Sequence, residues 1–228
     1  MKWKNGSFLS IDTETTGVGD DARVCSVACV EFHRGRMIEQ WTALCNPGPG
    51  IDWASPQVLE ALELNKLRPV DLLNAPELRY VMPRIVEYAE RCPVWAGHNI
   101  GFDLDLLHLG CHLRRAPDVI LDTILIDTVL GSPCESRSLS KVALRRNVED
   151  FDLHTAVGDA MTVGRIIQSY WPHMPDTIAD LREMMHIGRY RRQKELDARD
   201  DGKERRVRFP MLDGHDWLAK EPLDRAAH

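Results

Sequence analysis

The sequence predicts an α/β fold in which a mixed sheet is flanked by helices. The first 45 residues carry three apolar, β-rich segments in close succession, which is typical of an antiparallel meander. Further along the chain, short apolar segments alternate with segments that have helical spacing. Strands first, and then strands alternating with helices, indicate a mixed sheet with helices packed on it.

Five segments are expected to form the strands of this sheet. They are, in order, residues 8–12, 23–32, 37–45, 93–96 and 119–122. The sequence HRGR forms a turn between the second and the third strand. The sequence NPGPG follows the third strand, and its prolines and glycines break regular structure there.

Five segments carry the spacing of apolar residues that is typical of helices. They are residues 55–64, 78–91, 102–113, 138–145 and 155–170. The last of them is expected to end before Pro172, because proline cannot continue a helix. The sequence contains no internal repeat.

Composition narrows the class of protein. The 228 residues, 43% of them hydrophobic, suit one domain of ordinary size with an appendage. A net charge of -6 argues against a protein that coats nucleic acid by bulk charge. The six cysteines are scattered along the sequence. Cys25 and Cys29 are closely spaced, but a zinc site usually needs a second such pair, and the sequence has none, so we expect reduced thiols and no zinc site. We see no signal peptide or membrane span and therefore expect a cytoplasmic protein.

The first motif is IDTET at residues 11–15. Side chains two positions apart in a strand point the same way, so Asp12 and Glu14 are expected to project side by side at the strand end. Two carboxylates at that distance resist joint ionisation unless a cation lies between them. Magnesium and manganese prefer such oxygen ligands. Taken alone, the motif is equally compatible with a turn that carries two solvated acids.

Two further motifs place polar residues at helix starts. In WAGHNIGFDLDLL, a short strand leads to His98, and Asp103 falls in the first turn of the next helix, where the helix dipole favours a carboxylate. In LHTAVGDA, His154 precedes a helix that carries Asp159, five residues further on. A histidine in such a loop is suited to general-base chemistry near neutral pH.

In this order, the three motifs resemble those of the DEDD superfamily of 3′–5′ exonucleases. IDTETTG, GHNIGFDLDLL and HTAVGDA are similar to its first, second and third motifs, and the His-to-Asp spacing is that of the histidine branch (DEDDh). This branch is typified by the proofreading subunit of bacterial replicative DNA polymerase. The segment SLSKVALRRNVEDFDL and the pair Asp122-Thr123 add to the resemblance, which covers about residues 5–172.

The resemblance implies a ribonuclease H-like fold, a five-stranded mixed sheet with helices on both sides. It also implies two magnesium or manganese ions as cofactors. Asp12 would contact both ions, Glu14 and Asp159 would help hold the ion beside the attacking water, and Asp103 would support the other. His154 would take the proton from that water.

The expected partner is a single-stranded or frayed 3′ end of DNA. The resemblance implies that Thr15, Thr16 and Gly17 lie near the terminal nucleotide, with backbone N–H groups free for its 3′-hydroxyl. His98, Asn99 and Phe102 are the other expected contacts of the substrate strand. Where the family often has His-Gly-Ile-Thr, this chain has Asn65-Lys66-Leu67-Arg68. In the family this region helps to shape the path of the substrate strand, so the resemblance does not define that path here.

Two alternatives stay open at this point. The catalytic residues of an exonuclease that trims RNA would be the same, and no residue can be assigned to reading the 2′-hydroxyl. The chain would otherwise serve mainly as a scaffold bound to a DNA polymerase, although a complete set of catalytic residues argues against that. A polymerase is also a conceivable partner of the active enzyme in proofreading or repair.

The composition shifts after Pro175, so we expect an exonuclease domain at residues 1–175 and a charged extension or small module at residues 176–228. Residues 189–208 contain nine basic and five acidic residues, a local balance of +4. This stretch suits either a solvated segment or a contact with nucleic acid. Sequences around His186 and Trp217 resemble, in degenerate form, a small C-terminal module of some phage and bacterial exonucleases, and a plain extension is the alternative.

Overall fold

The computed structural model describes residues 2–19, 21–109, 112–149 and 151–198. Its strands are β1 (Ser7–Thr15), β2 (Val24–His33), β3 (Arg36–Leu44), β4 (Val94–Gly97) and β5 (Val119–Asp122). They form one sheet in the order β3-β2-β1-β4-β5. β1 pairs antiparallel with β2, and β2 with β3, whereas β4 runs parallel to both β1 and β5. The predicted five-stranded mixed sheet is confirmed.

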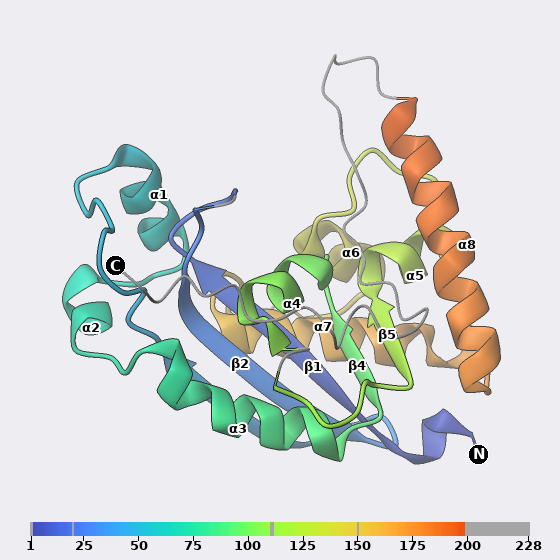
Figure 1. Cartoon of the computed structure of the whole chain (residues 1–228). Coiled ribbons are helices and arrows are strands. Elements are labelled where there is room, and N and C mark those ends of the chain that lie inside the picture. The colour runs from blue at the N-terminus through green and yellow to red at the C-terminus, as the bar shows by residue number, and fades with distance from the viewer. Residues whose placement is uncertain (1, 20, 110–111, 150, 199–228) are drawn as a thin grey trace.

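The helices connect and cover these strands (Figure 1). The α-helices are α1 (Pro56–Leu64), α2 (Pro69–Leu73), α3 (Leu78–Arg91), α4 (Gly101–Leu107), α5 (Thr123–Leu130), α6 (Leu139–Arg145), α7 (Ala156–Tyr170) and α8 (Ile178–Asp197). Two short 3-10 helices lie at Trp3–Asn5 and Trp171–His173. No helix in this part of the chain has the length and apolar character needed to cross a membrane.

Each face of the sheet has its own hydrophobic core. α7 crosses one face and packs on β1 and β2, together with residues of α5, α6 and α8. α3 and α4 cover the opposite face. β2 is buried along almost its whole length because helices lie on both sides of it. Figure 1 shows the resulting three layers, with α3 and α4 in front of the sheet and α7 behind it.

Alternation along β1 decides which side chains can meet at the site. Phe8 belongs to the core under α7, whereas Leu9 and Ile11 belong to the core under α3 and α4. Because side chains alternate along a strand, Asp12 and Glu14 share the α7 side with Phe8. The sequence had suggested that the two acids terminate the strand. The strand instead continues through both of them to Thr15, so they lie within its last residues.

Two helical predictions need correction. The helix predicted at residues 102–113 is shorter, because His108 adopts a left-handed conformation (φ 45°) that ends α4 at Leu107. α5 was not predicted, although its start is visible in the sequence as an N-cap. The carboxylate of Asp122 accepts a hydrogen bond from the backbone N–H of Ile124 at 2.8 Å. The short helix α2 was also missed.

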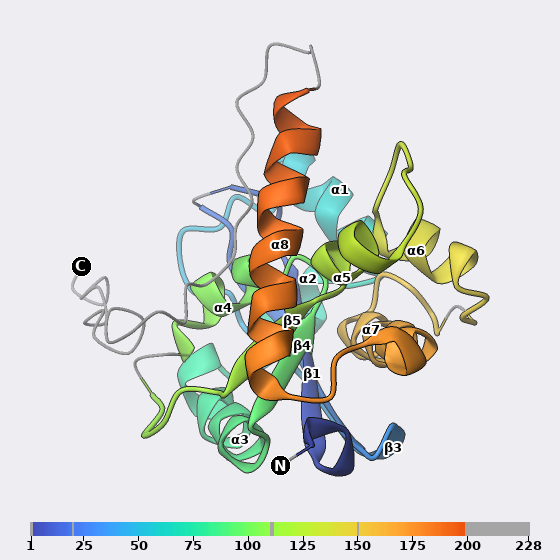
Figure 2. The same cartoon turned by 90° about the vertical axis from the view of Figure 1, so that its right-hand side faces the viewer.

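α8 packs against the sheet domain along α5 and β5 (Figure 2). Its residues Leu181, Met184 and Met185 are buried in the core under α7. Near its other end, Glu195 pairs at 2.9 Å with Arg137, whose buried guanidinium also binds Asp127. The helical part of the predicted extension therefore shares the core of the domain. The module-like sequence around Trp217 lies outside the described residues.

Candidate active site

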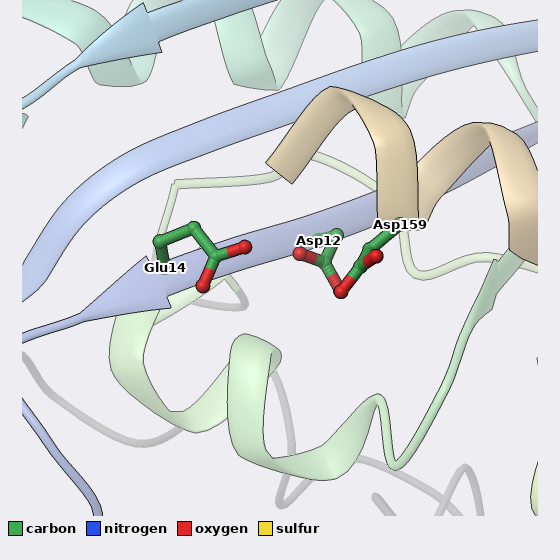
Figure 3. A group of neighbouring side chains, drawn as sticks. All are labelled: Asp12, Glu14 and Asp159. Atoms are coloured by element: carbon green, nitrogen blue, oxygen red, sulfur yellow. The ribbon is translucent and has the colours of Figure 1, made fainter. Parts of the chain in front are cut away.

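Three of the predicted carboxylates meet near the C-terminal end of β1, the central strand of the sheet. Asp12 and Glu14 come from β1, and Asp159 comes from the first turn of α7 (Figure 3). One carboxylate oxygen from each lies within 4.8 Å of the others. Asp159 lies 145 positions after Glu14 in the sequence, so the three carboxylates come together only when α7 packs on β1.

A β-bulge lies directly beside this cluster. Glu14 is paired with Ser26 on β2, whereas Thr15 is paired with Val24, so the partner strand holds one extra residue. Bulges of this kind bend a strand and re-aim its side chains, and they are frequent next to active sites. Here the irregularity separates Glu14 from the turn that follows β1.

Burial and mutual repulsion oppose ionisation of the clustered acids. Burial, and then the charges of the neighbouring carboxylates, raise the pKa of Asp12 well above its usual range. The same two causes raise the pKa of Glu14 to about 7. One oxygen of the Glu14 carboxylate, Oε1, is buried and has no hydrogen-bond partner within the described residues. A group with these properties is expensive to bury unless a ligand is bound to it.

These observations fit a divalent cation. The donor set is made only of carboxylate oxygens, as magnesium and manganese prefer. A cation would offset the repulsion among the three acids and would give the orphaned Oε1 of Glu14 a partner. The cluster of Asp12, Glu14 and Asp159 can therefore hold a metal ion.

Asp103 lies next to this cluster but is held from the other side of β1. Its Oδ1 accepts hydrogen bonds from the backbone N–H of Thr13 at 2.8 Å and from the Thr13 hydroxyl at 2.6 Å. Burial raises the pKa of Asp103 to about 7, although the Thr13 hydrogen bonds act in the opposite direction. Its charge in turn contributes to the raised pKa of Asp12. Sequence reasoning had not assigned a role to Thr13, which stands between the two acids of the first motif.

His154 lies in an exposed loop immediately before α7. Its φ of 65° is left-handed, and so is the φ of 59° at Asp152, two residues earlier. The backbone N–H of His154 donates to the Asp159 carboxylate at 3.2 Å. Thr155 caps α7 by accepting from the N–H of Gly158, and its hydroxyl donates to the Asp152 carbonyl at 2.8 Å. The loop is thus built onto the first turn of α7.

Gly158 makes this close packing possible, which gives a testable prediction. A Cβ at this position would lie 2.0 Å from the carbonyl oxygen of Phe151 and 2.4 Å from that of Asp152. Both atoms belong to the backbone, so in Gly158→Ala the loop that carries His154 must move. The general-base role that the motif resemblance implies for His154 then predicts that catalytic activity falls by about 10- to 100-fold, because an ångström-scale displacement of a general base has that effect.

Single-turnover rates and thermal midpoints of Gly158→Ala and the wild type would check this expectation. Gly131→Ala is not a suitable control, since its Cβ would also meet backbone. Gly6→Ala is suitable, because its Cβ would lie at an ordinary contact distance of 3.4 Å from the Trp3 carbonyl oxygen and the φ of Gly6, -103°, is open to alanine. If Gly158→Ala cleaves at the wild-type rate, the loop tolerates displacement and the prediction is wrong.

The turn after β1 uses its own hydroxyls. The Thr15 hydroxyl donates to the Gly17 carbonyl at 2.6 Å, and the Thr16 hydroxyl accepts from the Arg23 N–H at 3.1 Å. The backbone N–H of Thr16 donates to the Arg23 carbonyl at 3.0 Å. The expectation that this N–H is free for a 3′-hydroxyl is therefore wrong. Contact of Thr15, Thr16 or Gly17 with a substrate stays a prediction.

The remaining predicted contacts lie between β4 and α4. His98 is partly buried, and its Nδ1 lies 2.7 Å from the hydroxyl of Thr123. Burial lowers the pKa of His98 to about 4, so its ring is neutral at physiological pH. Asn99 is exposed with a left-handed φ of 59°, and its N–H donates to buried Asp122 at 3.2 Å. Phe102 is partly exposed at the start of α4.

Solved structures share this architecture at low sequence identity. Exonuclease X in complex with 5′-overhanging duplex DNA aligns with a TM-score of 0.62 and 18% identity over 78% of this chain and 99% of that chain. E. coli exonuclease I with a dT13 oligonucleotide aligns with a TM-score of 0.59 and 14% identity over 85% of this chain and 46% of that one. The RNase domain of yeast Pop2 aligns with a TM-score of 0.59 and 12% identity, over 73% and 77%.

At these identities the similarity establishes the fold, which is ribonuclease H-like as expected. Curated proteins give no significant match to the sequence. A model of the RNase_T exonuclease family matches residues 9–167. This match defines the protein as a nuclease, a hydrolase that acts on nucleic acid. The chain belongs to this exonuclease family, and its acidic motifs are those of the DEDD-type 3′–5′ exonucleases.

Proposed function

We propose that this protein removes nucleotides from the 3′ end of DNA and releases nucleoside 5′-monophosphates, with two magnesium or manganese ions as cofactors. The observation that carries the proposal is the convergence of Asp12, Glu14 and Asp159, with one oxygen of each inside a 4.8 Å cluster. Asp103 borders the cluster, and His154 is joined to it through Asp159.

Each acid has a role in this proposal. Asp12 would contact both ions, Glu14 and Asp159 would hold one of them, and Asp103 would support the other. When bound, the ions would supply positive charge to the phosphate and make the attacking water more acidic. His154 accepts a proton from that water, for which its exposed position is suited. The water oxygen bonds to phosphorus, the bond from phosphorus to the 3′-oxygen breaks, and that oxygen is protonated as it leaves.

The terminal nucleotide would lie against the turn after β1. Thr15, Thr16 and Gly17 follow Glu14 directly in the sequence. Gly17 adopts a φ of 152°, which residues with a side chain rarely adopt, so the turn there carries no side chain. The substrate strand would then pass over His98, Asn99 and Phe102, which lie just after the end of β4 and at the start of α4. Contacts to the backbone of the strand fix its register, whereas none of these residues is placed to read a sequence.

DNA is proposed over RNA because exonuclease X, which aligns over almost its entire length, was solved with duplex DNA bound. Removal of a 3′-terminal nucleotide suits proofreading or repair, in which a frayed 3′ end leaves a duplex. The proofreading subunit of a bacterial polymerase would be the matching precedent, with a DNA polymerase as partner. RNA trimming remains the alternative outcome of the test.

A digestion panel tests the proposal. Single-stranded DNA labelled at either end, a duplex with a mismatched 3′ end, RNA of the same sequence, and a closed circular DNA strand would be incubated with Mg²⁺, Mn²⁺ or EDTA. We expect a descending ladder from the 5′-labelled linear DNA, faster cleavage of the mismatched end, and no cleavage in EDTA. Asp103→Asn should be inactive, and Asp105→Asn, exposed on the same helix, is its matched control.

Three outcomes would overturn parts of the proposal separately. Full activity in excess EDTA would remove the role of the ions. Cutting of the circular strand at a comparable rate would contradict an exonuclease that starts from a 3′ end. Faster degradation of RNA than of DNA would identify RNA as the substrate, and the proposed mechanism would be unchanged.

A further inference from the structure

The turn between α1 and α2 contains an unusual lysine. The N–H of Lys66 donates to the carbonyl of Glu63 at 3.1 Å, and the N–H of Leu67 donates to that of Leu62 at 2.8 Å. These two hydrogen bonds form a Schellman motif, which closes a helix with one residue in the left-handed region. Lys66 is that residue, with a φ of 57°.

Glycine is the usual residue at this position, because a side chain is strained when φ is positive. The chain therefore carries a lysine where the backbone conformation favours glycine. Left-handed residues other than glycine also occur elsewhere in the described chain, as at His108 after α4, so the contacts of the Lys66 side chain decide what it adds here.

Lys66 contacts the loop that carries His154. Its Nζ lies 2.5 Å from the carboxylate of Asp152 and donates to the carbonyl of Leu153 at 3.0 Å. Both partners directly precede His154, although they are 86 and 87 positions from Lys66 in the sequence. The amine thus bridges two consecutive residues of the loop and fixes the backbone that leads into His154.

The preceding residue contacts the other side of the site. Asn65 is buried, and its side-chain amide donates to the carbonyl of Thr15 at 3.2 Å. Thr15 follows Glu14 directly and lies beyond the β-bulge. The same turn therefore touches both segments that flank the carboxylate cluster, through Asn65 at the end of β1 and through Lys66 at the His154 loop.

We propose that Lys66 is a positioning residue for catalysis, which holds the His154 loop in place through Asp152 and the Leu153 carbonyl. This inference rests on the proposed function of His154. In this proposal Lys66 acts through the loop, although its charge also acts on Glu14, where it opposes the rise in the pKa of that carboxyl. A glycine at the same place in the turn would lack both contacts, and the loop would then be held only by its hydrogen bonds to the first turn of α7.

The strength of these contacts sets the expected effect. Lys66 and Asp152 are half or more exposed, and exposed ion pairs are weak. Together with one charged hydrogen bond, they can favour one loop position by a factor of about 5 to 30. Loss of the amine should therefore lower kcat by about that factor, with KM nearly unchanged, because substrate contacts remain.

Three substitutions of Lys66 separate this role from folding. Lys66→Gly relieves the left-handed strain, so its thermal midpoint should equal or exceed that of the wild type while kcat falls. Lys66→Met keeps the length of the side chain and should lose the same rate. Lys66→Arg keeps the charge and should recover most of it. Arg68→Gln, which loses only the pair of exposed Arg68 with the nearby, half-buried Asp71, is the matched control and should cleave at the wild-type rate.

A double-mutant cycle with Asp152→Asn tests the contact itself. Asp152→Asn should lower kcat in the wild type, but it should add little to Lys66→Met, because the two changes remove the same ion pair. Hydrogen exchange of residues 151–156 gives a readout without activity, and Lys66→Gly should accelerate it while Arg68→Gln does not. If the wild type proves inactive on every nucleic acid, the proposed function fails, and the exchange result still decides whether Lys66 holds the loop.

Two results would overturn the inference. A rise in KM with unchanged kcat in Lys66→Met would mean that the amine binds the substrate phosphate directly. Unchanged exchange of residues 151–156, together with additive effects of Lys66→Met and Asp152→Asn, would show that the contact does not hold the loop.

Discussion

His154→Ala is expected to bind divalent cations as the wild type does and yet to cleave DNA about 100 to 10,000 times more slowly, the usual contribution of a general base. The carboxylates that form the candidate metal site remain in this variant, so cation affinity should be preserved. Only the group that we propose as acceptor of the proton from the attacking water is lost. His154 is exposed in its loop, so its removal leaves no cavity in the core.

Single-turnover kinetics would measure the rate of His154→Ala, and calorimetry would measure its affinity for Mn²⁺. Asp159→Ala is the contrasting variant, because it removes a member of the carboxylate cluster and should weaken cation binding itself. His173→Ala, another exposed histidine outside the site, is the matched control and should be fully active. Near-normal turnover of His154→Ala around pH 7 would place the base elsewhere.

The parts of the site that could be predicted are those that follow from the spacing of residues within a single strand or helix. The side chains of Asp12 and Glu14 share one face because strand side chains alternate, and Asp103 and Asp159 fall in first turns whose starts are readable. The resemblance to known motifs then indicated that these separate segments form one site, which the periodicity of each segment cannot show. The fold class followed from the order of strands and helices in the same way.

The parts that were missed depend on contacts between distant segments. The hydrogen bonds of Asp103 to Thr13 span 90 positions, and the contact of Lys66 with Asp152 spans 86. No local pattern signals such a pair. The engaged N–H of Thr16 was missed for the same reason, since its acceptor, Arg23, becomes a neighbour only when β1 and β2 pair.

Helix ends were predicted less well than helix existence. α4 ends six residues before its predicted end, because His108 takes a left-handed conformation that its residue type does not announce. α8 was assigned by its charge to an extension, but its apolar residues Leu181, Met184 and Met185 pack in the core. Charged residues on the exposed side of a long helix obscured that apolar side.

Raising the pH is expected to destabilise the metal-free protein, and added Mg²⁺ or Mn²⁺ is expected to reverse the effect. The folded state raises the pKa of Glu14 from 4.5 to about 7. Between these two pH values the folded protein holds a proton that the unfolded chain has released, so the free energy of unfolding falls as the pH rises. For Glu14 alone the loss is on the order of 3 kcal/mol, at 1.36 kcal/mol for each pKa unit. Asp12 and Asp103 are shifted in the same direction and add to it.

Urea unfolding in EDTA at pH 5 and pH 8, repeated with Mg²⁺, would measure this dependence. A bound cation favours the ionised acids, so the stabilisation by Mg²⁺ should be larger at pH 8 than at pH 5. Glu14→Gln carries no titrating group at this position and should lose part of the pH dependence, becoming more stable than the wild type at pH 8 in EDTA. Glu60→Gln, exposed on α1, is the matched control and should behave as the wild type. If the metal-free wild type is as stable at pH 8 as at pH 5, the acids of the cluster are not held against ionisation, and the main physical argument for a cation between Asp12, Glu14 and Asp159 is lost.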